Sequence, residues 1–202
     1  MRIPKKDSIK NYLFKYIRKL REQVKVVTVD ISGSYISIIK QWFPKAKIVL
    51  DRFHVIQHLY RAMMTTRIAL MKSFDNKSQT SRLLKYHWQF FQKDSRKLSK
   101  ESFFCKTLTQ TVTPRVVNHK TLSHCKELRY YYDLYQLLLF HFQEQRIDAF
   151  FSLIEENLTF TNKIFKTVFK TFIKHKTYIT NALKTSYSNA KLETTNKLIK
   201  RY

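Results

Sequence analysis

Hydrophobic positions in the first fifty residues change from a helical spacing to β-branched runs and back. Residues 7–22 carry apolar side chains three or four positions apart, which predicts a helix. Residues 24–29 (Val-Lys-Val-Val-Thr-Val) predict a largely buried strand. A short helical pattern over 35–42 precedes a second β-branched run over 47–50. A strand, a helix and a strand this close together predict a βαβ unit with a parallel pair.

An aspartate follows each predicted strand. Asp30 ends the first run and Asp51 ends the second. Because the carboxyl ends of parallel strands face one crevice, we expect both residues at one polar site. Each carboxylate has two interpretations, a metal ligand or the N-cap of the helix that follows, and Arg52 offers Asp51 an ion-pair partner.

Beyond Phe53 the spacing of apolar residues is helical for most of the chain. With one glycine and three prolines, the sequence lacks the turn residues of an all-β protein. Pairs and triplets of aromatic residues, such as Phe90-Phe91, Phe103-Phe104, Tyr130 to Tyr132 and Phe150-Phe151, are expected in the core. The predicted helices are 53–74, 79–98, 121–145, 147–158, 162–184 and 188–202.

The excess of basic residues indicates that this mostly helical protein has a polyanionic partner. Lys and Arg number 39 against 14 Asp and Glu, a formal net charge of +25. Nucleic acid is the expected partner. No apolar run approaches the roughly 18–20 residues that span a bilayer, so we expect no membrane. Two cysteines form no disulfide framework, which favours a reducing cytoplasm.

Three further sets of residues have both a bland and a chemical interpretation. His54 and His58 share a helix face, as a metal pair would, although a structural role is favoured. Glu193 has Lys197 one helical turn away, which explains it as a surface ion pair. The sequence also has four residues of the types that bind zinc, but they lack the CxxC or HxxxH spacing of known zinc sites: Cys105, His119, His124 and Cys125.

Three segments in order resemble the transposases of bacterial insertion sequences of the ISL-three family. Residues 27–35 (Val-Thr-Val-Asp-Ile-Ser-Gly-Ser-Tyr) resemble the strand that ends in the family's second catalytic aspartate. Residues 43–55 (Phe-Pro-Lys-Ala-Lys-Ile-Val-Leu-Asp-Arg-Phe-His-Val) contain its Asp-x-x-His motif. Residues 187–196 (Tyr-Ser-Asn-Ala-Lys-Leu-Glu-Thr-Thr-Asn) resemble the helix with its catalytic glutamate. The resemblance extends over residues 10–202.

The resemblance implies a mixed α/β fold, mostly α, with a partial ribonuclease-H-like core interrupted by an all-helical insertion. The core would comprise residues 1–58 and 186–202, and the insertion residues 59–185. Asp30 and Glu193 would be catalytic and would bind Mg²⁺ or Mn²⁺ for two-metal phosphoryl transfer on DNA.

Partners and location also follow from the resemblance. Asp51 and His54, of the Asp-x-x-His motif, would lie near the site. The partners would be the ends of the insertion sequence and its target DNA, and further transposase copies. The protein would act in the bacterial cytoplasm at the nucleoid.

The sequence also departs from the family pattern. No strand before Asp30 supplies the family's first catalytic aspartate, so we expect a truncated chain with little activity alone. The alternative is a non-catalytic, basic DNA-binding or transposase-interacting remnant, and a decayed reading frame is a third option.

Overall fold

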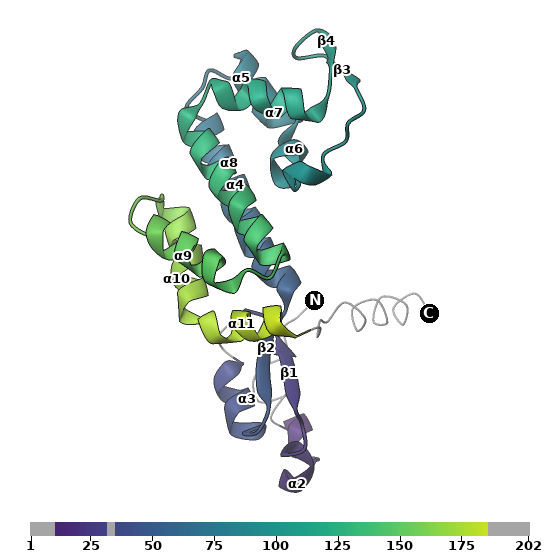
Figure 1. The fold of residues 1–202 in the computed structure, drawn as a ribbon, viewed down its shortest axis with the longest axis vertical. Helices are drawn as coiled ribbons and strands as arrows, with labels where there is room; N and C mark the ends of the chain where they lie inside the picture. Colours follow the sequence, from purple (N-terminus) through teal and green to yellow (C-terminus); the bar gives the residue numbers. More distant parts are fainter. Residues whose placement is uncertain (1–10, 32–34, 186–202) are drawn as a thin grey trace. The chain divides into compact units, whose positions relative to one another are not determined.

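A computed structural model describes residues 11–31 and 35–185 of the chain (Figure 1). They are mostly helical, as predicted, and they contain two small sheets. The chain divides into two compact units. The first unit contains the described residues 11–31, 35–55 and 175–185, and the second contains residues 56–174.

The first unit is built on a two-stranded parallel sheet. Strand β1 (Val26–Val29) pairs with β2 (Lys47–Leu50), and helix α3 (Ile36–Trp42) connects them. The predicted strand–helix–strand order with a parallel pair is therefore confirmed. The expectation of a buried first strand is wrong, because all four residues of β1 are half-buried, whereas the last three residues of β2 are fully buried.

Helix α11 (Lys176–Lys184) packs on the same sheet. Its Asn181 donates from Nδ2 to the Ile48 carbonyl oxygen at 2.9 Å. The amide groups of Lys47 and Asp51 donate to carbonyls next to or within β1, so every second residue of β2 turns its backbone polar groups toward β1. Ile48 lies between these residues, and its carbonyl therefore faces away from β1. Tyr178 adds its ring to the apolar cluster between α3 and the sheet. The helix thus covers the second edge of β2.

The helix predicted over residues 7–22 is interrupted. Helix α2 contains only Arg18–Arg21, and Ile17 before it has an extended backbone with ψ of 152°. The interruption accompanies two contacts on one indole ring. Phe14 packs edge-on against Trp42 with ring centroids 4.4 Å apart, and the Arg21 guanidinium lies 4.5 Å from the same ring. Tertiary contacts with Trp42 thus replace the regular helix.

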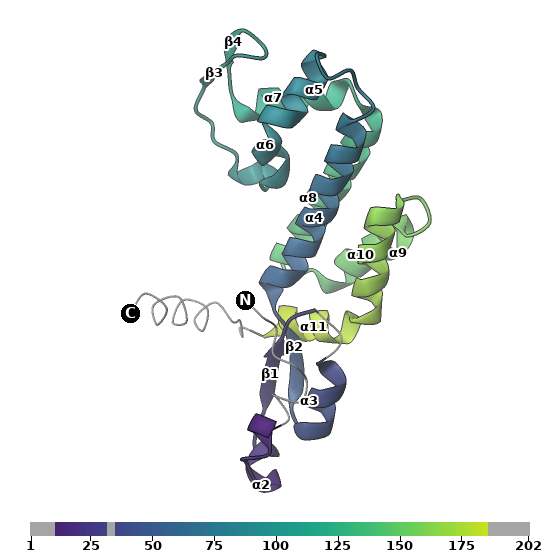
Figure 2. The ribbon, with the colours of Figure 1, turned by 180° about the vertical axis from the view of Figure 1, so that it is seen from behind.

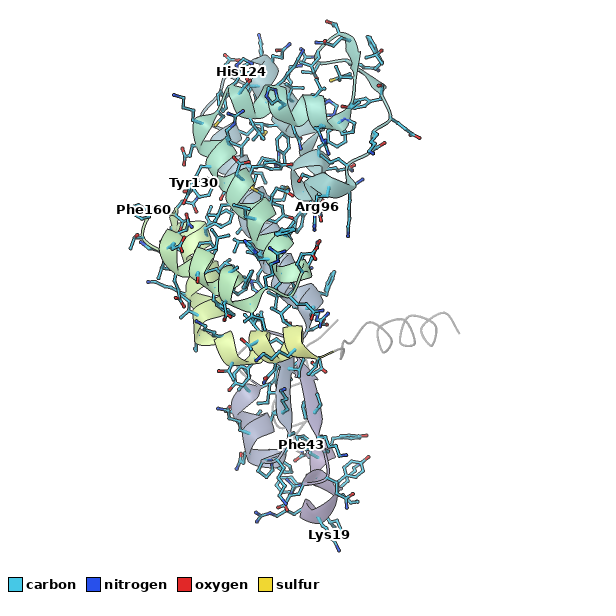
Figure 3. The ribbon with its side chains drawn as sticks, viewed as in Figure 1. Lys19, Phe43, Arg96, His124, Tyr130 and Phe160 are labelled. Atoms are coloured by element: carbon cyan, nitrogen blue, oxygen red, sulfur yellow. The ribbon has the colours of Figure 1, made fainter. Side chains whose placement is uncertain are left out.

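The second unit is a bundle of helices with an aromatic core. The longer helices are α4 (Arg52–Met71), α8 (Lys126–Gln143), α9 (Ile147–Asn157) and α10 (Lys163–Lys174). Five phenylalanines of α9 and α10 are buried: Phe150, Phe151, Phe165, Phe169 and Phe172. Most predicted aromatic core residues are confirmed, but Phe104 and Tyr130 are 62% and 37% exposed. Tyr130 is labelled in Figure 3.

Shorter elements fill the middle of the chain. The predicted helix 79–98 is divided at His87 and Lys93, and a hairpin that the sequence pattern did not predict follows it. The helix predicted over 121–145 begins earlier and breaks at His124 and Cys125, and the one over 162–184 breaks at His175. The shorter elements are α5 (Gln79–Tyr86), α6 (Trp88–Gln92), the 3₁₀ helix η1 (Ser95–Lys97), β3 (Phe103–Cys105), β4 (Gln110–Val112) and α7 (Pro114–Ser123).

Side-chain packing accounts for the break at His87. Its ring stacks on Phe90 with centroids 5.4 Å apart, and its Nε2 lies 3.4 Å from the Cys105 Sγ. The backbone there has φ of −113° and ψ of 26°, which is not helical. A histidine is no helix breaker by itself, so the apolar spacing could not reveal this turn.

Candidate functional site

The two predicted aspartates lie at one edge of the parallel sheet. The last paired residues are Val29 and Leu50, and Asp30 and Asp51 are the next residue on each strand. The Asp51 amide donates to the Val29 carbonyl at 2.9 Å, which extends the pairing to this edge. The backbones of the two aspartates are therefore neighbours at the carboxyl end of the sheet.

Asp51 has a structural role. Its side chain is buried, and Oδ1 accepts a hydrogen bond from the Phe53 amide at 3.1 Å. This is the geometry of an N-cap, in which a side-chain oxygen satisfies an amide of the first helical turn. Of the two interpretations of Asp51, the structure thus shows the cap of α4.

Asp30 has a different environment. Its side chain is 53% exposed, and Oδ1 accepts from the Ile31 amide at 2.6 Å. The Nδ1 atom of His54 lies 3.4 Å from the same oxygen. That distance suits an ion pair when the imidazole is protonated, but the contact lacks the geometry of a hydrogen bond. The carboxylate of Asp30 therefore remains accessible, with a histidine from the first turn of α4 beside it.

Arg52 does not pair with Asp51 in the described part of the chain, so the predicted ion pair is wrong. Its guanidinium instead donates to the carbonyls of Ala182 at 2.8 Å, Leu183 at 3.3 Å and Thr185 at 2.5 Å. The last carbonyls of a helix have no partner within that helix, and its C-terminus attracts cations. Arg52 thus caps the end of α11, a role that no local sequence pattern indicated.

The other candidate metal ligands do not come together. Among the described residues, no group of three or more His, Cys, Asp or Glu side chains could hold a metal ion. Cys105 is buried beside His87, and the Cys125 Sγ accepts from the Leu128 amide at the start of α8. His58 lies edge-on to Phe172. The second predicted catalytic residue, Glu193, lies outside the described residues.

Comparison with known proteins supplies the class that this arrangement belongs to. A family model described as a transposase matches residues 4–202. The match covers almost the whole chain, and the protein therefore belongs to the ISL3 (ISL-three) family of transposases. No curated protein and no solved structure gives a significant match. Within the described part, no helix has both the length and the apolar character that crossing a bilayer requires.

Proposed function

We propose that the first unit is the catalytic core of a transposase that uses an Asp-Asp-Glu set of carboxylates on DNA. It would have a partial ribonuclease-H-like fold, and the second unit would be its helical insertion. The predicted core, residues 1–58 and 186–202, is kept in this proposal. The packing of α11 on β2 supports extending the core to include residues 175–185.

One observation carries the proposal. Asp30 directly follows β1 of a parallel βαβ unit, and its half-exposed carboxylate has no arginine or lysine among the ion pairs of the described residues. An accessible carboxylate that pairs with no arginine or lysine among the described residues suits a hard divalent cation, which prefers oxygen ligands. Asp51, in contrast, is occupied as the cap of α4. This difference favours Asp30 as the metal-binding residue of the pair.

The proposed chemistry is cleavage and strand transfer of an insertion sequence. Asp30 and Glu193 would hold Mg²⁺ or Mn²⁺, which when bound activates the attacking hydroxyl and offsets charge at the scissile phosphate. His54 would orient the Asp30 carboxylate through their 3.4 Å contact. Lys and Arg would hold the DNA through its phosphates.

A second candidate is a DNA-binding or transposase-interacting protein without catalysis. The net charge of +25 favours it. Such a protein would bind DNA in a salt-sensitive manner that is indifferent to the carboxylates.

Binding of Mn²⁺, followed by electron paramagnetic resonance, separates the two candidates without requiring activity. The wild type, Asp30→Asn and Glu193→Gln are titrated with MnCl₂, together with Asp75→Asn as a control. Asp75 is an aspartate of the second unit whose Oδ1 accepts from the Lys77 amide in a turn. The catalytic proposal predicts weaker Mn²⁺ binding in the first two variants alone. Equal binding in all four proteins would leave only the second candidate.

A further inference from the structure

A groove in the second unit lies between α4 and α10. Its volume is about 400 Å³. Arg61 and Thr65 come from α4, and Lys163 and Thr167 from α10, with buried Ala62 between them. The Asn162 side chain joins the start of α10 to α4 by donating to the Thr66 hydroxyl at 3.1 Å. Figure 2 shows the ribbons of α4 and α10. The two walls are thus held together by packing and by a hydrogen bond.

Helix α10 has one apolar and one cationic face. Phe165, Phe169 and Phe172 are buried. Lys163, Lys170 and Lys174 are exposed, and with a helical repeat of 3.6 residues they project from the opposite side, next to the groove. Burial of the three phenylalanines therefore fixes a row of lysines along one rim.

No acidic residue neutralises these cations within the segments that form the groove. The sequence contains no Asp or Glu between Asp51 and Asp75, or between Glu156 and Glu193. The groove itself is lined without an acidic side chain. None of the ion pairs found among the described residues includes Arg61, Lys163 or Lys170. The groove is consequently a concentrated site of uncompensated positive charge.

Other basic clusters of the second unit differ in this respect. Arg96 pairs with Asp94 at 2.9 Å and with Glu144 at 3.1 Å (Figure 3). A second cavity of about 400 Å³, between α7 and α8, contains Arg115 and Arg129 but also Asp133. Acidic neighbours lower the attraction of both clusters for an anion. The comparison singles out the groove between α4 and α10.

We propose that this groove binds the phosphate backbone of duplex DNA. Arg61, Lys163 and Lys170 would contact phosphates, and the Thr65 hydroxyl would donate to a phosphate oxygen. The inference rests on the proposed function, since it takes DNA as the substrate, and it adds where the DNA lies. Contacts of this kind release counterions and do not read sequence.

The test is fluorescence anisotropy with a labelled 25-base-pair duplex of arbitrary sequence, in 50 to 200 mM NaCl. Lys163→Gln/Lys170→Gln is compared with the wild type and with Lys106→Gln/Lys126→Gln. The control removes two exposed lysines of the same unit from outside the groove, so both variants have the same net charge. The groove variant should bind more weakly. Its negative slope of log affinity against log salt concentration should become shallower by about 2, because two phosphate contacts are lost. The slope of the control should not change.

The outcomes separate this inference from the catalytic proposal. Equal effects of the two double variants would overturn the groove, because net charge alone would then explain binding. Asp30→Asn should bind DNA as the wild type does, since Asp30 is not part of the groove. Failure of the wild type to bind the duplex at 50 mM NaCl would overturn both proposals.

Discussion

The Arg52 guanidinium donates to the carbonyl oxygen of Thr185, which lies 133 residues further along the chain, at 2.5 Å. Two more donations, to Ala182 and Leu183, make this side chain the cap of helix α11. The neighbouring residue, Asp51, caps the start of α4. Two consecutive residues after β2 therefore terminate one helix and begin another.

Replacing Arg52 by Gln should destabilise the protein, because three helix-terminal carbonyls lose a charged donor. We expect the free energy of unfolding in urea to fall by about 1–3 kcal/mol. Arg18→Gln is the matched control, since the Arg18 side chain is 80% exposed and its pair with Glu22 lies on the surface. That variant should stay within about 0.5 kcal/mol of the wild type. Similar losses in both variants would contradict the capping role of Arg52.

Substitutions of Asp51 distinguish a cap from a charge. Asn retains a side-chain oxygen that can accept from the Phe53 amide, whereas Ala does not. Asp51→Ala should therefore lose about 1 kcal/mol in urea unfolding, and Asp51→Asn much less. If both variants lost the same stability, the negative charge of Asp51 and not its hydrogen bond would be the important property.

Asn181→Ala should also be destabilising, because it leaves the Ile48 carbonyl without its donor at the edge of β2. The expected loss is about 1–3 kcal/mol. Asn181 and Arg52 both fasten α11, so the double variant Asn181→Ala/Arg52→Gln should lose less than the sum of the two single losses. Strict additivity in urea unfolding would mean that the two attachments act independently.

Stability should depend on pH through His87. Burial lowers the pKa of this imidazole below its ordinary value of 6.5. The neutral form is thus favoured in the folded protein, and the unfolded chain binds the proton first. The contribution of His87 to the free energy of unfolding is fully present above about pH 6.5. It is lost as the pH falls toward the lower pKa of the folded state. Unfolding free energies measured at intervals from pH 7.5 to 5 should show this fall.

Variants assign the pH effect to this residue. His87→Gln should flatten the pH dependence, whereas His124→Gln, which replaces an exposed histidine, should retain it. A wild-type slope that persists in His87→Gln would show that another group is responsible.

Local patterns predicted the elements whose causes are local. The strand over 47–50 and the helix over 35–42 agree with β2 and α3 to within one residue. The hairpin of β3 and β4 has no glycine, and its turn places Thr109 at φ of 52°, where glycine is usual. Without that signal, the sequence offered no reason to expect a turn.

The candidate site shows the same division. The two aspartates were predicted at one sheet edge because their positions follow from strand ends. The partner of Arg52 could not be predicted, because the carbonyls that it binds come more than 100 residues later and carry no side-chain signature. For the same reason α11 was predicted as part of the insertion, although it packs on β2.

The late return of α11 to β2 also has a consequence for biosynthesis. Ribosomes add roughly 5–20 residues per second, so the 133 residues that separate Arg52 from Thr185 take about 7–27 s to synthesise. During that interval the nascent β1–α3–β2 segment has one edge of β2 without its helix. Strand edges of this kind pair readily with other chains. A ribosome-bound chaperone that shields the segment until α11 emerges would therefore raise the yield of folded protein.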